Sequence, residues 1–137
     1  MISAPRRAGA LALLGFGAFA AAPAEATGSL ACSAIDGSGA SVEMNVTLSP
    51  VEAPLWIRVS LKDELWSSLP DDNATQVAIA QAFSDATELS VDVADEQAER
   101  IVASLRVLRT EHDEARYQFG YLHLLGRGVF PVSCEGP

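Results

Sequence analysis

The sequence predicts a mainly β fold, a single small antiparallel β-sandwich or barrel closed by one disulfide bond. Three observations predict it. Runs in which apolar and polar residues alternate recur along the chain at the spacing of about 8 to 12 residues that is typical of sandwiches and barrels. Turn-forming residues separate these runs, most clearly at Asp36-Gly37-Ser38-Gly39. The two cysteines, Cys32 and Cys134, lie near opposite ends of the predicted domain.

The amino-terminal residues have the pattern of a secretory signal peptide. Two arginines precede an uncharged apolar run from Ala8 to Ala22, and Ala24-Glu25-Ala26 places small residues at the two positions that a signal peptidase reads. The apolar run is about 15 residues long, whereas a membrane-spanning helix needs roughly 20. We therefore predict a signal peptide over 1–26 and a single exported, β-rich domain over 27–137, located in the periplasm or secreted.

The positions of the two cysteines favour a disulfide bond, because a lone pair in an oxidising compartment is usually bonded. A Cys32–Cys134 bond closes nearly the whole domain, and a loop of about 100 residues stabilises the fold by about 4.7 kcal/mol on the chain-entropy model. The alternatives are a thiolate metal site, a redox pair and lipid attachment at Cys32. They are disfavoured because further ligands are lacking, the pair is not a C-x-x-C motif, and Leu30 lies one place too late for a lipoprotein signal.

The charge of the chain restricts its partners. The chain has 18 acidic and 9 basic residues and a net charge of −9. Such a charge repels nucleic acid and anionic lipid heads at long range. We therefore expect no nucleic-acid partner and no membrane span. A protein partner, basic if charge guides it, or simple solubility of a monomer fits better.

Several runs are predicted as strands from strict alternation. In 41–48 the apolar residues Val42, Met44, Val46 and Leu48 alternate with polar ones. The same pattern places Leu55, Ile57, Val59 and Leu61 on one face of 55–61. Residues 29–35 and 88–93 complete the set of clear strands.

Two segments fit both a strand and a helix. Residues 75–83 alternate, but their alanines also suit a helix. Residues 95–109 carry a helical stripe that includes Ile101, Leu105 and Leu108, with Asp95 as a possible cap. The same segment also alternates, so we favour a strand and keep one helix around 95–109 as the alternative.

The stretch 114–129, EARYQFGYLHLLGRGV, resembles the first helix and turn of a Sel-one-like repeat, a relative of the tetratricopeptide repeat. The resemblance implies helical hairpins that stack and bind proteins. However, Phe130-Pro131-Val132 replaces the expected second helix, and no second copy stands roughly 36 residues upstream. We therefore favour strands at 116–125 and 129–134 around the turn Gly126-Arg127-Gly128. Pro131 lacks an amide donor, which predicts an edge strand or a bulge.

Few residues offer catalytic chemistry. The chain lacks nucleophile-elbow, zinc-protease and phosphate-loop motifs, and a disulfide leaves no cysteine for catalysis. His112 is expected in a solvated turn and His123 at the edge of a sheet, while Asp71-Asp72-Asn73 reads as a turn rather than a cation loop. For Trp56 and Trp66 we favour packing over an exposed binding surface. We predict no enzyme activity, no cofactor and no metal.

The sequence therefore favours a non-catalytic exported β domain that binds a partner or acts as an accessory in the cell envelope. In architecture it is similar to the small periplasmic inhibitors of lysozyme, and an acidic inhibitor would be steered toward a basic enzyme. Such inhibition is one alternative function. The helical Sel-one-like protein-binding module is the other.

Overall fold

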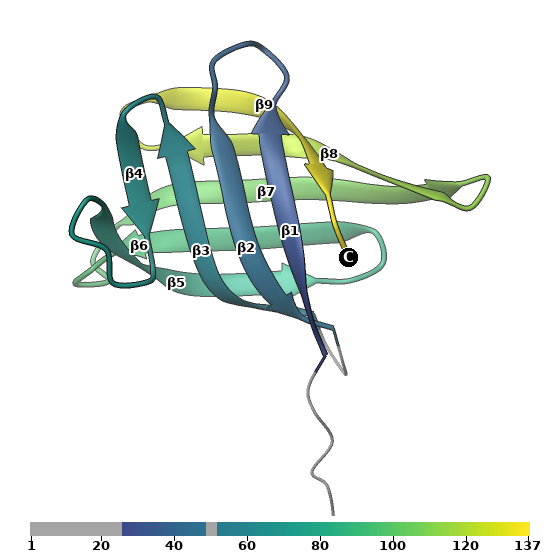
Figure 1. Ribbon diagram of the computed structural model, residues 1–137, viewed down its shortest axis with the longest axis horizontal. Coiled ribbons are helices and arrows are strands. Elements are labelled where there is room, and N and C mark those ends of the chain that lie inside the picture. Colours follow the sequence, from purple (N-terminus) through teal and green to yellow (C-terminus); the bar gives the residue numbers. More distant parts are fainter. Residues whose placement is uncertain (1–25, 49–51) are drawn as a thin grey trace, which may run out of the picture.

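The computed structural model describes residues 26–48 and 52–137, and every regular element within these residues is a β-strand (Figure 1). The strands are β1 (Thr27–Ala34), β2 (Ser41–Thr47), β3 (Ala53–Leu61), β4 (Glu64–Ser67), β5 (Thr75–Ser84), β6 (Glu88–Asp95), β7 (Ile101–His112), β8 (Ala115–Leu124) and β9 (Gly128–Glu135). Each strand pairs with the next, and β9 pairs with β1, so the sheet is a closed barrel. The predicted β fold is confirmed. Apart from Ala26, the predicted signal peptide lies outside the described residues.

One parallel pair allows this barrel to close. The described residues form an odd number of strands, so antiparallel pairing throughout would leave β1 and β9 parallel. The short contact between β4 and β5 is parallel instead, at Trp66 opposite Thr75 and Ser67 opposite Gln76. That contact reverses the direction of every later strand, and β9 meets β1 antiparallel.

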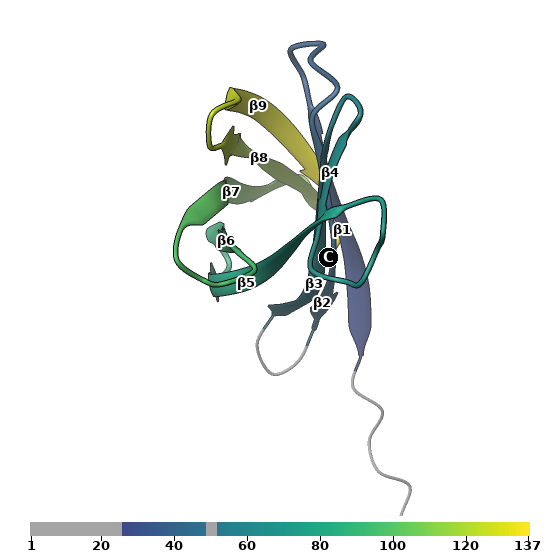
Figure 2. The ribbon, with the colours of Figure 1, turned by 90° about the vertical axis from the view of Figure 1, so that its left-hand side faces the viewer.

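The barrel is flattened into two crossed layers. In Figure 1, β1–β4 run down the page in front while β5–β9 run across it behind, and Figure 2 shows the two layers from the side. Such steep crossing is one of the two usual ways in which sheets pack face to face. The chain passes from one layer to the other between β4 and β5, and the pairing of β9 with β1 joins the layers a second time. In the part of the chain that the structure describes, no helix is long and apolar enough to cross a membrane.

Alternating side chains from both layers fill the interior. The predicted core face of β2 is confirmed, because Val42, Met44 and Val46 are almost completely buried. The largest side chains that are fully buried with them include Leu30, Ile57, Leu89, Leu105, Leu122 and Leu124. Burying an apolar side chain of this size stabilises a fold by roughly 1.5–3 kcal/mol. Leu48 and Leu55, which the alternation also placed inside, are 42% and 54% exposed.

Both ambiguous segments are strands, so the helix considered around 95–109 is wrong. Residues 95–100 form a turn in which the Asp95 carboxylate accepts the backbone N–H groups of Glu99 (2.8 Å) and Arg100 (3.4 Å). Ala98 has φ 58°, which is incompatible with a right-handed helix. From Ala103 to Arg109, every second side chain points into the barrel, and two residues of the supposed helical stripe, Ile101 and Leu108, are exposed.

The Sel-one-like resemblance does not reflect the fold. Its residues lie in the β7–β8 turn, β8, the following turn and the start of β9. Gln118, Leu122 and Leu124 are buried at a period of two, as a strand requires. The helical hairpin that the resemblance implies is therefore wrong for this segment.

Two further features differ from the sequence analysis. The short strand β4 was not predicted, because four residues are too few to show a period. β9 is not an edge strand, since it lies between β8 and β1. Pro131 lies just beyond the last β1–β9 residue pair, so the ladder does not need the N–H that proline lacks. Its carbonyl still accepts the N–H of Ile35 (3.0 Å).

Candidate functional site

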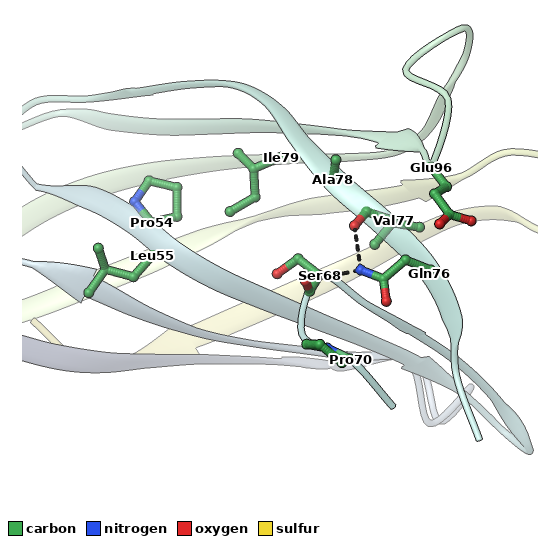
Figure 3. Close-up of a pocket in the computed structure, with 9 residues that line it drawn as sticks. All are labelled: Pro54, Leu55, Ser68, Pro70, Gln76, Val77, Ala78, Ile79 and Glu96. Carbon is green, nitrogen blue, oxygen red and sulfur yellow. Dashed lines mark hydrogen bonds between the residues drawn. The ribbon is translucent and has the colours of Figure 1, made fainter. Parts of the chain in front are cut away.

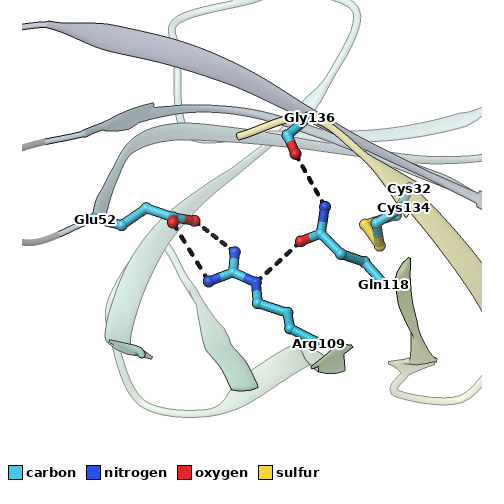
Figure 4. The surroundings of a disulfide bond; sticks show 6 residues. All are labelled: Cys32, Glu52, Arg109, Gln118, Cys134 and Gly136. Atoms are coloured by element: carbon cyan, nitrogen blue, oxygen red, sulfur yellow. Dashed lines mark hydrogen bonds and ion pairs between the residues drawn. A yellow bond between two sulfur atoms is a disulfide. The ribbon is translucent and has the colours of Figure 1, made fainter. Parts of the chain in front are cut away.

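The predicted disulfide is present and joins the first and last strands. Cys32 and Cys134 face each other across the β1–β9 pair with their Cα atoms 4.0 Å apart, and both are buried (Figure 4). They are the only cysteines of the chain. Both thiols are therefore used in structure, and the bond covalently closes the barrel.

A buried arginine closes one end of the barrel near the disulfide (Figure 4). The Arg109 guanidinium forms an ion pair with Glu52, and its Nε donates to Gln118 Oε1 (3.0 Å). It also donates to Ser84 Oγ at 2.8 Å. Gln118 Nε2 in turn donates to the carbonyl of Gly136 (3.0 Å). These bonds connect β7, β8 and the carboxyl-terminal segment. The cluster therefore stabilises the fold, and its polar groups are already paired.

The two histidines lie on β7 and β8 and are not brought together with the acidic loop. His112 ends β7, is highly exposed, and has Nε2 3.2 Å from the Asp113 carboxylate. His123 is exposed on β8 opposite Ser104 and Val129. Among the described residues, no three His, Cys, Asp or Glu side chains are placed to hold a metal ion.

The acidic loop is a turn, as predicted. The Asp71 carboxylate accepts the N–H of Asn73 (2.9 Å), and the Asp71 carbonyl accepts the N–H of Ala74 (3.1 Å). The two tryptophans are half-buried rather than fully exposed. Trp66 packs against the core, and Trp56 lies on β3 opposite Asn45.

A surface groove lies between β3 and β5, where short β4 leaves them unpaired (Figure 3). It has a volume of about 740 Å³ and is open to solvent. Its polar side chains are Ser68, Gln76 and Glu96, and Gln76 Nε2 donates to the carbonyls of Ser68 (3.1 Å) and Val77 (3.2 Å). The amide is thereby used to fasten β4 to β5, and the groove has few free polar groups that could orient a ligand.

The outward face of β5–β9 is the more informative surface. The register of these strands aligns their outward-pointing side chains in rows across the sheet. We call these outward-pointing side chains of β5–β9 the outer face. Its central row is Phe83, Ser90, Arg106, Tyr121 and Pro131. A neighbouring row is Glu88, Leu108, Phe119 and Ser133.

The outer face is rich in exposed aromatic and aliphatic side chains. Leu108 is 69% exposed, and Phe83, Phe119, Tyr121 and Tyr117 are between 43% and 52% exposed. The Tyr117 and Phe119 rings stack with their centroids 6.3 Å apart. A soluble monomer rarely leaves a large contiguous apolar patch in water, so such a patch marks an interaction surface.

An ion pair fixes the centre of the outer face. Arg106 donates to the Asp92 carboxylate at 2.8 Å and to the carbonyls of Leu105 (2.9 Å) and Val91 (3.3 Å). Burial opposes ionisation of Asp92, but hydrogen bonds from Gln81, Ser104 and Arg106 outweigh it and hold the pKa of Asp92 below its ordinary value. The outer face is therefore rigid at its centre.

The β7–β8 hairpin extends beyond the barrel, as the right-hand side of Figure 1 shows. All residues from Thr110 to Tyr117 are exposed, so neither side of this hairpin is covered. Its tip is acidic, with Asp113 and Glu114 in the turn and Glu111 opposite Arg116. The hairpin thus continues the outer face into an acidic projection.

Sequence reasoning did not find this face. It predicted a strand at 116–125, but a strand has two sides, and a period of two does not tell which one points inward. The inward side of β8 carries Gln118, Leu122 and Leu124, which are buried, and Gly120, which is half-buried. In comparisons with known proteins, no family model, no curated protein and no solved structure matches this chain.

Proposed function

We propose that this protein is an exported, non-catalytic domain of the cell envelope that binds a protein partner through its outer face. The observation that carries the proposal is the group of exposed side chains on the paired strands β7 and β8, namely Leu108, Tyr117, Phe119 and Tyr121. Tyrosine, phenylalanine and arginine are enriched in protein interfaces, and Arg106 lies opposite Tyr121 at the edge of this group. Export is supported by the disulfide, since such bonds persist in oxidising compartments.

The non-catalytic part of the proposal is supported by how the polar groups are used. Both cysteines are bonded, and the buried Arg109 is saturated by protein acceptors. Within residues 26–48 and 52–137, neither His112 nor His123 makes a hydrogen bond to a serine or threonine hydroxyl. A reaction needs convergent groups, and a binding function needs only the surface described above.

The test is capture of envelope proteins by the mature domain, compared between two variants. The Phe119→Ser and Tyr121→Ser double variant removes two central aromatic side chains of the outer face. Leu55→Ser is the control, because Leu55 is 54% exposed but lies on β3, in the other layer of the barrel. We expect wild type and control to capture the same protein and the double variant to lose it. Binding of the purified partner should weaken more than tenfold, as for interface hot spots worth about 2 kcal/mol or more. Equal capture by the double variant contradicts the proposal.

Inhibition of a basic enzyme such as lysozyme is the second candidate. It is favoured by the acidic charge of the chain and by the projecting hairpin with Asp113 and Glu114 at its tip. Charge steering is strongest at low ionic strength, so lysozyme activity should fall on addition of the domain at low salt and recover as salt increases. If lysozyme retains full activity at low salt, this candidate is removed while the general binding function stands.

A further inference from the structure

The outer face carries a small hollow between β6, β7 and β8, with a volume of about 300 Å³. Its floor is the row Leu89, Val107 and Gly120, which lie opposite one another in successive strands. The backbones of β7 and β8 approach closely at Gly120, since an added Cβ there would lie only 1.7 Å from the Arg106 carbonyl oxygen. The floor is therefore formed largely by backbone, and the rows on either side form its walls.

The walls combine an aromatic ring, an aliphatic chain and a carboxylate. Leu108 and Glu88 line one side, and Tyr121, Ser90 and Arg106 line the other. Leu108 and Tyr121 are 69% and 45% exposed, so both offer apolar surface to a ligand.

The charges in the hollow leave one carboxylate unpaired. Arg106 is bound to Asp92 at 2.8 Å, so its charge is balanced within the protein. The Glu88 backbone takes part in the β5–β6 turn, but its carboxylate makes no hydrogen bond or ion pair with any residue that the structure describes. The hollow with its ion pair therefore carries one net negative charge, in a chain whose own net charge is −9.

We propose that this hollow accepts a lysine or arginine side chain of a basic protein partner, an inference that rests on the proposed binding function. The aliphatic stem of such a side chain packs on Leu108, its cationic end lies near the Tyr121 ring, and the charge pairs with Glu88. Cations are attracted to aromatic faces, and long basic side chains bury their stems while the charged end stays in water. An acidic partner side chain is disfavoured because Glu88 and the field of the whole chain repel it.

The test is an NMR titration of the ¹⁵N-labelled domain with N-acetyl-lysine amide. N-acetyl-norleucine amide is the matched control ligand, because it has the same four-carbon side chain without the ammonium group. We expect saturable shifts at the backbone amides of Glu88, Leu108, Gly120 and Tyr121 with the lysine compound. With the norleucine compound we expect much weaker shifts.

Two variants identify the charge that is responsible. Glu88→Gln should weaken binding of the lysine compound about threefold, as expected for a partly exposed ion pair. Glu99→Gln should leave it unchanged, since Glu99 is an exposed carboxylate in the β6–β7 turn, outside the hollow. Equal binding of both ligands, shifts that map elsewhere, or no effect of Glu88→Gln each overturn the inference. If the hollow fails these tests while the Phe119/Tyr121 double variant still loses its partner, the inference fails and the proposed function stands. If lysine amide binds but no partner depends on the outer face, the proposed function fails.

Discussion

Asp92 is the most constrained charged side chain on the outer face. It is only 7% exposed, and its two oxygens accept hydrogen bonds from Gln81 Nε2 (2.7 Å) and Arg106 Nη2 (2.8 Å). Burial alone would raise the pKa of Asp92, but these bonds and one from Ser104 lower it. A carboxyl group whose pKa is lower in the folded than in the unfolded state stabilises the fold above the unfolded pKa of about 3.9. That contribution is lost as pH falls through the folded pKa.

We therefore expect Asp92→Asn to lower the free energy of unfolding by about 1–3 kcal/mol at pH 7, because Gln81 and Arg106 lose a charged acceptor. The difference from wild type should shrink as pH falls from the unfolded pKa of about 4 through the lower pKa that Asp92 has in the folded protein. Denaturant unfolding at a series of pH values measures this. Asp71→Asn is the control, since Asp71 is 3.6 Å from a partly exposed Arg58, and such pairs contribute at most about 1 kcal/mol. A destabilisation by Asp92→Asn that stays constant down to pH 2 would contradict the assignment.

The β7–β8 hairpin shows how one element departs from the best local sequence. Its two-residue turn has Asp113 at φ 50° and Glu114 at φ 64°, as in a type I′ turn. Asp-Gly suits such a turn well, because glycine tolerates positive φ without a steric cost. The chain instead has a glutamate there, which keeps a second carboxylate at the tip. The sequence analysis expected His112 in a solvated turn, whereas the structure extends β7 through His112 and leaves only Asp113 and Glu114 in the turn.

We expect Glu114→Gly to raise the free energy of unfolding by up to about 1 kcal/mol, since the left-handed conformation costs a side-chain-bearing residue about 1–2 kcal/mol and the greater freedom of glycine in the unfolded chain offsets part of the gain. Ala98→Gly is the matched comparison, because Ala98 has φ 58° in the β6–β7 turn and carries no charge. Thermal or chemical unfolding of both variants provides the measurement. If Ala98→Gly stabilises the protein and Glu114→Gly destabilises it, then the Glu114 side chain makes a stabilising contact. That result would contradict the expectation that positive φ at Glu114 costs stability.

Closure of the barrel depends on two contacts between its layers. The β4–β5 contact has only two residue pairs, and the β1–β9 contact has four, with the disulfide at Cys32 opposite Cys134. The cysteines are 102 positions apart, so the bond restricts almost the whole unfolded domain. The covalent bond therefore reinforces the β1–β9 contact, which has few paired residues.

We expect the Cys32→Ala and Cys134→Ala double variant to lose about 3–5 kcal/mol of stability, in line with a loop of this length. Denaturant unfolding under non-reducing conditions measures the loss. Intact mass after alkylation of the exported wild-type protein without reductant is the companion measurement. It should show no added label, and labelling of both cysteines in the folded protein would refute the bond.

The local sequence was sufficient to predict a strand wherever the apolar residues fitted only a period of two. Val42, Met44 and Val46 alternate with polar residues and support only a strand, so the core side of β2 could be predicted. The cysteine pair likewise needed only its spacing and an oxidising compartment. Residues 95–109 fitted two periods equally well, because propensity differences between helix and strand are small for such residues.

Tertiary structure decided the rest, because it depends on which strands meet and in which register. Barrel closure requires a strand at 101–112 and places Arg109 inside, where Gln118 across the β7–β8 hairpin and Glu52, which is distant in sequence, complete its bonds. The same register aligns Glu88, Leu108 and Tyr121, from three different strands, around one hollow. A strand pattern records that two faces exist, but only pairing with neighbours determines which face is buried and which side chains become neighbours on the exposed one.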